Sequence, residues 1–252
     1  RASGLPTQQV LALDTSDETL GEQGTRYRRP PLRLFDWMEQ NMKILVVVPT
    51  YNEAGTLPYL ARQLLSLNIP DLELLVVDDN SPDGTAAVAE ELKASHLGRI
   101  HILGRSRKEG IGPAYVAGFH EALRLGGQVI IQMDADLSHP PNYVPALLEG
   151  IKTHDVVVGS RYISGGGIAG HWAFLRRLLS RGGDLYVRWI LGLHIQDTKS
   201  GFKAFRREVL EQLSLEKLRS TGFVFQAEVL YHCQERGFSI QEIPFLFQER
   251  GA

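Results

Sequence analysis

The chain contains only one cysteine, Cys233, among its 252 residues. An internal disulfide and a zinc or iron–sulfur site built from several cysteines are therefore excluded. The chain also lacks a long apolar stretch, because its longest uninterrupted run, Ile44 to Val48, falls far short of the roughly 20 residues that a membrane-spanning helix needs. We expect no transmembrane helix in these residues.

An excess of charge of either sign is also missing. The 27 Lys and Arg residues oppose 29 Asp and Glu residues, which gives a formal net charge of −2. Without a basic field, we expect no nucleic acid among the partners. With 43% apolar and 22% charged residues, the chain has the balance of one globular domain of ordinary enzyme size.

The first 41 residues show no steady strand or helix period and contain several arginines around Pro30 and Pro31. We interpret residues 1–41 as a flexible N-terminal extension, with a basic surface-binding arm as the alternative. No apolar segment follows these arginines, so the stretch is not expected to be a signal peptide. Residues 42–252 are predicted to form a single folded domain.

From Met42 onwards, short apolar runs rich in Val and Ile alternate with amphipathic helical patterns. Such runs are typical of strands buried on both faces. The alternation predicts an α/β fold, with a mostly parallel sheet and helices on both faces. Ligands bind such sheets at the carboxyl ends of the strands. The expected strand and helix pairs are 43–48 and 54–67, 74–77 and 86–94, 100–103 and 113–125, and 129–133 and 143–151, followed by a helix at 223–231 and a strand at 239–247.

Two acidic residues, Asp134 and Asp136, follow the fourth expected strand. Because they are two residues apart, they share one side of an extended segment. Paired carboxylates suit Mg²⁺ or Mn²⁺, which substrate phosphates usually complete. The nearby His139 is either a further ligand or a hydrogen-bonding residue of the proline-rich turn.

The ends of the first two expected strands are also polar. The turn from Pro49 to Glu53 carries an aromatic ring and a carboxylate, which suit a base or ribose, although Asn52 also suits a helix cap. Asp78 and Asp79 are adjacent at a buried strand end, where they would repel each other unless one has a donor partner. A nucleoside offers such donors, and Asp79 is the stronger candidate.

Basic residues gather in the second half, around the flexible stretch Gly165–Gly167. Arg176 and Ser180 are four residues apart and face one way on a helix, so with Arg161 they form a candidate pocket for a phosphoryl group. A solvated basic helix face is the alternative. Cys233 is interpreted as a packed side chain, because nothing in the sequence marks it as an activated nucleophile.

Together, five motifs in order resemble those of family 2 glycosyltransferases of GT-A fold, and within them the dolichyl-phosphate (polyprenyl-phosphate) mannose synthases. The resemblance covers about residues 43–250 and is more specific for the family than for the sugar. It implies that residues 42–252 form a GT-A catalytic domain. The motifs are Val46–Glu53, Val76–Thr85, Met133–Pro141, Gly159–Tyr162 and Ser200–Lys203.

The resemblance also implies roles for individual residues. Asp134 and Asp136 would place Mg²⁺ or Mn²⁺ on the donor diphosphate, with Ser138, where some relatives have Gln, acting through water. Lys199 stands where the family usually has Thr. Arg161, a catalytic residue with Asp134 and Asp136, would receive the acceptor phosphate together with Arg176 and Ser180. The donor would contact Pro49, Tyr51, Glu53, Val77, Asp79, Asp134, Ala135, Asp136, Lys203 and Arg250.

The implied reaction is the inverting transfer of mannose from GDP-mannose to dolichyl or polyprenyl phosphate. It would occur at the cytoplasmic face of a membrane through peripheral contact, and a membrane-anchored partner subunit is an open alternative. A phosphate monoester is an anion at neutral pH, since its second pKa is near ~6, so no strong protein base is required. Alignment and charge stabilisation are what the enzyme must supply.

Three other functions compete with this one. A polyprenyl-phosphate glucosyltransferase that uses UDP-glucose would share the same strand-end motifs. A noncatalytic subunit that binds a sugar nucleotide belongs to another class, but it would have little need of Asp134 and Asp136. A nucleotidyltransferase typically has a Gly-rich loop after the first strand, whereas the turn from Pro49 to Glu53 contains no glycine.

Overall fold

The computed structural model describes residues 42–169 and 174–249, excluding the side chains of residues 174–179. The predicted N-terminal extension, residues 1–41, lies outside this part. In the described ranges, no helix has the length and apolar character needed to cross a bilayer. The elements in chain order are β1 (Ile44–Thr50), α2 (Leu57–Ser66), β2 (Leu72–Asp78), α3 (Thr85–Ser95), β3 (Ile100–Gly104), α4 (Ile111–Arg124), β4 (Val129–Gln132), η1 (Pro141–Tyr143), α5 (Val144–Ile151), β5 (Val156–Ser160), β6 (Gly167–Ile168), α6 (Phe174–Leu191), β7 (Lys203–Arg206), α7 (Arg207–Gln212), η2 (Leu215–Lys217), α8 (Val224–Glu235), β8 (Ile240–Pro244) and β9 (Leu246–Phe247).

Seven strands form the central sheet in the order β3-β2-β1-β4-β7-β5-β8. All neighbours are parallel except β7, which runs antiparallel to β4 and β5. The predicted mostly parallel sheet is therefore confirmed, although the sequence patterns did not indicate the antiparallel strand. The expected last strand is divided in two, because β9 leaves the main sheet and pairs with β6.

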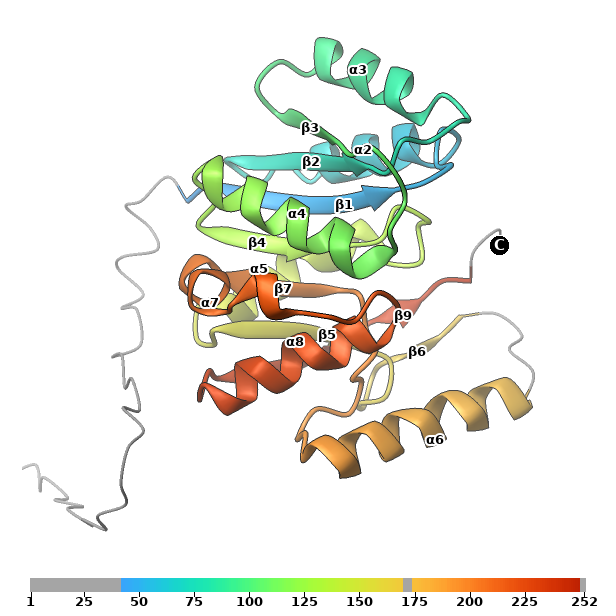
Figure 1. Ribbon diagram of the computed structural model, residues 1–252, viewed down its shortest axis with the longest axis vertical. Helices are drawn as coiled ribbons and strands as arrows, with labels where there is room; N and C mark the ends of the chain where they lie inside the picture. The colour runs from blue at the N-terminus through green and yellow to red at the C-terminus, as the bar shows by residue number, and fades with distance from the viewer. Residues whose placement is uncertain (1–41, 170–173, 250–252) are drawn as a thin grey trace, which may run out of the picture.

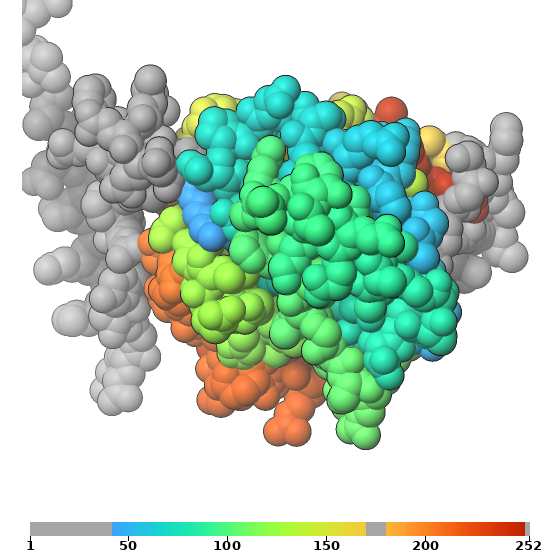
Figure 2. Space-filling model, turned by 90° about the horizontal axis from the view of Figure 1, so that it is seen from above, coloured from blue at the N-terminus to red at the C-terminus, as the bar shows by residue number. Residues whose placement is uncertain are grey.

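Helices cover both faces of the sheet (Figure 1). Alternate residues of β1 point to opposite faces, so Val46 and Val48 pack with α2 and α5, whereas Leu45 and Val47 pack with α4 and α8. Gly118 lets α4 lie close to the sheet, since a Cβ at this position would collide with Val47. Figure 2 shows the molecule from above in the sense of Figure 1, where atoms of the cyan to green segments around α2, α3 and α4 form much of the visible face.

The register between strands brings the polar motifs to one edge. β1 and β2 pair from Ile44 opposite Leu72 to Thr50 opposite Asp78, so both strands end at the same level. β4, which pairs with the other side of β1, ends at Gln132. The turns that follow these strands therefore lie side by side at the carboxyl edge, as expected for parallel strands.

Candidate active site

Two cavities lie at this edge and share walls. The first, here called the Tyr51 cavity, has a volume of about 520 Å³ and lies against the turns after β1 and β2. The second, called the Arg161 cavity, has a volume of about 530 Å³ and lies between the end of β5 and α6. Their shared walls are formed by Asp134, Asp136, Lys199, Gly201 and Phe223.

The two acidic residues predicted as metal ligands therefore stand at the junction of the cavities. Asp134 accepts a hydrogen bond of 2.6 Å from the Tyr115 hydroxyl, and Asp136 accepts one of 3.1 Å from the Ser138 backbone N–H. Leu137 has a φ of 65°, so the chain turns back immediately after Asp136. This turn keeps both carboxylates at the cavity edge, on either side of the buried Ala135.

His139 has a structural role in this turn. Its Nδ1 accepts a hydrogen bond of 3.1 Å from the Asp134 backbone N–H, and its ring stacks on Phe202 with 5.3 Å between ring centroids. Burial lowers the pKa of His139, against the opposing charges of Asp134 and Asp136. Because Nδ1 already accepts this hydrogen bond, the structure favours the hydrogen-bonding role over metal ligation.

The donor set fits a divalent cation that is completed by a substrate. Within the described ranges, no group of three or more His, Cys, Asp or Glu side chains is arranged to hold a metal ion. Asp134 and Asp136 nevertheless offer carboxylate oxygens at the cavity junction. Two carboxylates with diphosphate oxygens and water form an ordinary Mg²⁺ site. Ser138 lines the Arg161 cavity beside them.

The Tyr51 cavity contains most of the residues expected to hold the donor, namely Pro49, Tyr51, Glu53, Asp79, Asp134, Ala135 and Asp136. Val77 differs, because it is fully buried in the core beneath α4 and lines neither cavity. Two cations that the sequence patterns did not single out lie near this wall. Lys108 Nζ is 3.8 Å from the centroid of the Tyr51 ring, and Arg105 forms an ion pair with Asp79.

Asp78 and Asp79 have separate hydrogen-bond donors, as their expected repulsion requires. Asp78 turns inward and accepts hydrogen bonds from Thr50 Oγ1 at 3.0 Å and from Ser81 Oγ at 2.6 Å. Asp79 faces the cavity and pairs with Arg105. Burial raises the pKa of Asp79, although Arg105 opposes the shift. Only Asp79 is therefore placed to meet a ligand.

The Arg161 cavity is lined by two cations held by buried acids. Arg161 donates to Asp197 through Nε at 2.7 Å and through Nη2 at 2.6 Å. Burial opposes ionisation of the guanidinium, but the hydrogen bonds and charge of Asp197 raise the pKa of Arg161 overall. Lys199 Nζ lies 3.2 Å from Asp184 and donates to the Ser180 carbonyl at 3.0 Å. Both cations thus have fixed positions in the cavity wall.

Four more residues were expected in the site, and they differ in position. Ser180 lines the Arg161 cavity, and its Oγ lies 2.8 Å from the Tyr162 hydroxyl. Lys203 lines neither cavity, because it is fully buried beneath them. The side chain of Arg176 and the whole of Arg250 lie outside the part of the chain that the structure describes.

Several residues of the site were not indicated by the sequence patterns. Tyr115 and Gln226 lie on expected helices, where they resemble core residues, and Asp197 lies in a loop without a motif. Tyr115 is covered by α8 and sheet residues, Gln226 lines the Tyr51 cavity, and Asp197 is completely buried against Arg161. The sequence alone does not assign a buried acid or amide to a site, because the assignment depends on knowing which side chain it contacts.

Comparison with known proteins agrees with this geometry. The sequence profile of Glycosyl transferase family 2 matches residues 45–214. A polyprenol monophosphomannose synthase of Mycolicibacterium smegmatis is 41% identical over 209 residues, covering 82% of this chain and 78% of that protein. An undecaprenyl-phosphate mannosyltransferase of Micrococcus luteus is 40% identical over 209 residues, covering 83% of this chain and 85% of that protein.

Solved structures show the same fold. The glucosyl-3-phosphoglycerate synthase of Mycobacterium tuberculosis, crystallised with Mn²⁺, UDP-glucose and glycerol 3-phosphate, superposes with a TM-score of 0.65 at 21% identity. The superposition covers 90% of this chain and 79% of that one. At this identity the likeness concerns the fold alone, which is the predicted GT-A fold. With the profile and the two relatives, it follows that the chain belongs to glycosyltransferase family 2.

Proposed function

We propose that the protein transfers mannose from GDP-mannose to a polyprenyl or dolichyl phosphate, with inversion at the anomeric carbon. The observation that carries this proposal is the meeting of two cavities at Asp134 and Asp136. The two relatives are named as a polyprenol monophosphomannose synthase and an undecaprenyl-phosphate mannosyltransferase. Those names support mannose and a polyprenyl-type phosphate as the transferred sugar and the acceptor.

The Tyr51 cavity is the proposed donor site. Tyr51 offers a ring face to a base, and Asp79 offers a partly paired carboxylate to base or ribose donors. Lys108 stands over the Tyr51 ring, where its charge is favourable for a diphosphate. From this cavity the diphosphate would extend to Asp134 and Asp136, which would hold Mg²⁺ or Mn²⁺.

The Arg161 cavity is the proposed acceptor site. A guanidinium fixed by a buried carboxylate cannot swing away, so Arg161 presents its remaining surface to the cavity in one orientation. Lys199 and Ser180 supply further donors to a phosphate on the same wall. Fixed donors stabilise charge without reorganisation during the reaction.

The reaction needs alignment more than proton transfer. An acceptor phosphate oxygen forms a bond to C1 of mannose as the bond between C1 and the diphosphate oxygen breaks. The acceptor is already an anion at neutral pH, so the chain need not provide a strong base. A bound divalent cation would stabilise the charge of the leaving diphosphate, and Arg161 would orient the attacking oxygen.

The proposal is tested by incubating the protein with polyprenyl phosphate, Mg²⁺ and labelled GDP-mannose or UDP-glucose, and measuring label in the lipid phase. We expect transfer from GDP-mannose, loss of transfer in excess chelator, and little transfer by Asp136→Asn. Preferred transfer from UDP-glucose would favour the glucosyltransferase alternative. Nucleotide binding without transfer from any donor would favour a noncatalytic subunit.

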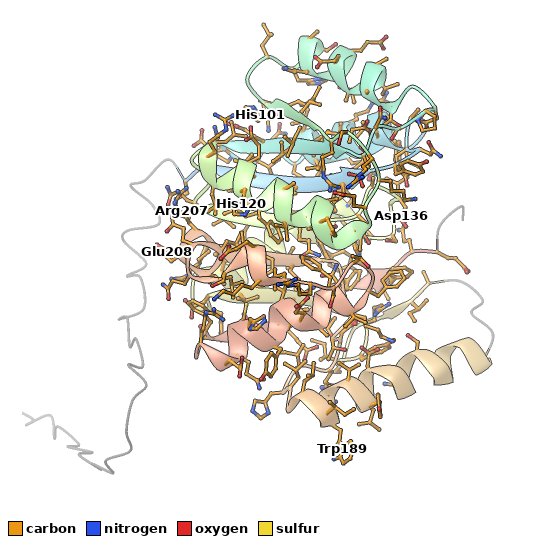
Figure 3. The ribbon with its side chains drawn as sticks, in the orientation of Figure 1. His101, His120, Asp136, Trp189, Arg207 and Glu208 are labelled. Carbon is orange, nitrogen blue, oxygen red and sulfur yellow. The ribbon has the colours of Figure 1, made fainter. Side chains whose placement is uncertain are left out.

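We also propose that the protein contacts the membrane peripherally, at the cytoplasmic face, through α6. Four large apolar side chains of this helix, Leu185, Tyr186, Trp189 and Ile190, are between 54 and 81% exposed. Asp184, which comes just before these residues, is buried and accepts a hydrogen bond from Thr198. Trp189 points away from the rest of the molecule (Figure 3).

This arrangement suits a lipid surface. An interfacial helix presents aromatic and aliphatic residues to the bilayer, and basic residues attract anionic lipids. Arg181, exposed on the same helix, supplies such a charge. Because Ser180 and Asp184 of α6 also hold the wall of the Arg161 cavity, contact through this helix would bring the proposed acceptor site close to the membrane.

A further inference from the structure

A buried polar network lies beneath Asp134 and takes no direct part in the proposed reaction. It consists of side chains from four different elements, Tyr115 of α4, Gln132 of β4, Lys203 of β7 and Gln226 of α8. Each is at most 3% exposed. Gln132 Nε2 and Lys203 Nζ both donate to Gln226 Oε1, whereas Gln132 Oε1 has no hydrogen-bond partner among the described residues. Hydrogen bonds of this kind offset the cost of burying polar groups and favour one arrangement.

Tyr115 connects this network to the site. Its hydroxyl donates to Asp134 Oδ1 at 2.6 Å. The ring is held separately, by stacking with Phe225 at 6.1 Å and with Phe119 at 5.9 Å between centroids. The position of the hydroxyl therefore does not depend on the hydrogen bond alone.

The backbone of Gly201 encloses the same carboxylate on another side. A Cβ at residue 201 would lie 3.1 Å from Asp134 Oδ2 and 3.1 Å from His139 Cε1, so only glycine fits without displacement. Lys203 fixes this loop from below by donating to the Ser200 carbonyl, and it also donates to Gln226 Oε1 at 2.5 Å. Asp134 is thus confined between a hydroxyl and a braced loop.

We infer that Tyr115 is a positioning residue for the cation site, and that its hydroxyl holds the Asp134 carboxylate in one orientation at the junction of the two cavities. The inference rests on the proposed function, because it requires a cation at Asp134. Mutation of a residue that hydrogen-bonds to a metal ligand typically lowers metal affinity by about 10- to 100-fold. Removal of this hydroxyl should therefore weaken cation binding without changing the nucleotide contacts.

The test compares wild type with Tyr115→Phe, which deletes one oxygen and keeps the stacked ring. GDP binding is measured by calorimetry with and without Mn²⁺, and Mn²⁺ binding is measured by electron paramagnetic resonance. We expect the gain in GDP affinity due to Mn²⁺ to fall by about 10-fold or more. GDP affinity without metal should be unchanged. A hydroxyl with a purely structural role would lower the melting temperature but leave the gain intact.

Tyr231→Phe is the matched control. The Tyr231 hydroxyl also donates to a carboxylate at 2.6 Å, that of Glu235, but on the exposed side of α8. This variant should retain the full gain from Mn²⁺. In an Asp134→Asn background, Tyr115→Phe should cause no further loss, since its effect acts through that carboxylate. This second comparison also tests the inference if Tyr115→Phe is less stable than wild type.

Three results would overturn the inference. If Mn²⁺ increased the GDP affinity of Tyr115→Phe as much as that of wild type, the inference would be rejected and the proposed function would stay in place. An additional loss in the Asp134→Asn background would show that Tyr115 acts by another route. If wild type itself gained nothing from Mn²⁺ with GDP or with UDP, the proposed cation site would fail together with the inference. The use of both nucleotides separates this test from the identity of the donor.

Discussion

Arg161 and Asp197 form a two-pronged ion pair in the wall of the Arg161 cavity, with N–O distances of 2.7 and 2.6 Å. The backbone N–H of Arg161 adds a third hydrogen bond of 2.9 Å to the same carboxylate. Asp197 is completely buried, whereas the Arg161 side chain retains 9% exposure and lines the cavity. The pair therefore works as a rigid support for one cationic surface.

This support predicts that charge alone is insufficient at position 161. Arg161→Lys keeps the charge that Asp197 requires but loses the planar two-pronged geometry. We expect turnover with polyprenyl phosphate to fall about 10-fold or more, which corresponds to ~1.4 kcal/mol, with the KM for GDP-mannose nearly unchanged. Steady-state kinetics with each substrate varied in turn would measure both effects.

Arg207→Lys provides the control for this prediction. Arg207 pairs with Glu211 at 2.7 Å and lies on the opposite side of the molecule from Asp136 (Figure 3). Its substitution should leave both kinetic constants as in wild type. If Arg161→Lys instead raised the KM for GDP-mannose and left the kinetics with polyprenyl phosphate as in wild type, the assignment of the two cavities would be reversed.

Gly201→Ala tests the close approach of the loop to Asp134. The added methyl group would crowd both Asp134 Oδ2 and His139, so we expect loss of most transfer activity and of Mn²⁺-dependent nucleotide binding. Gly104→Ala is a suitable control, because a Cβ there has no heavy atom within 4 Å and the residue lines neither cavity. Equal activity of the two variants would contradict the proposed constraint.

Trp189→Ser tests membrane contact through α6. The bound fraction on vesicles with anionic lipids, measured by flotation, should fall several-fold, because a largely exposed indole no longer enters the interface. Leu97→Ser, at a residue that is 87% exposed in the turn after α3, should bind as wild type. Unchanged flotation of Trp189→Ser would reject the proposed contact. The contact would also be rejected if the wild-type protein were a dimer and Trp189→Ser dissociated it.

Lys203 predicts a pH dependence of stability. Burial lowers its pKa from 10.5 to about 7, whereas the unfolded chain keeps a value near ~10.4. Between these values the unfolded state binds more protons, so the contribution of Lys203 to the free energy of unfolding increases as the pH rises from about 7 towards about 10. Below about pH 7 the buried amine is charged in the folded state, and the contribution is at its lowest.

Denaturant titrations from about pH 7 to about pH 9.5 would measure this contribution. The free energy of unfolding should rise more steeply with pH in wild type than in Lys203→Met. Lys152→Met, which removes a surface amine that pairs with Glu149, should keep the wild-type slope. Equal slopes for wild type and Lys203→Met would show that the amine does not titrate in this range.

Much of the site could be predicted because parallel strands bring their carboxyl ends to one edge. Tyr51, Asp79, Asp134 and Asp136 follow three different strands and line one cavity for that reason. The family resemblance also placed Val77 near the donor, but Val77 lies inside the buried strand β2 and its side chain packs in the core.

The parts that could not be predicted depend on contacts between distant segments. Tyr115 has the spacing of a core residue, and only its distance to Asp134 shows that its hydroxyl serves the site. Asp197 lies 36 residues from Arg161, and no local pattern links them. The antiparallel strand β7 follows from its pairing between β4 and β5, which a run of four residues does not indicate.

The shared walls of the two cavities have a thermodynamic consequence for the order of events. Lys199 and Gly201 belong to both cavities, so a ligand that displaces the loop on one side alters the shape of the other. Linkage then requires reciprocity: if the sugar nucleotide raises the affinity for the lipid phosphate by some factor, the lipid phosphate raises the affinity for the sugar nucleotide by the same factor. By the same linkage, release of either product would change the affinity of the protein for the other product.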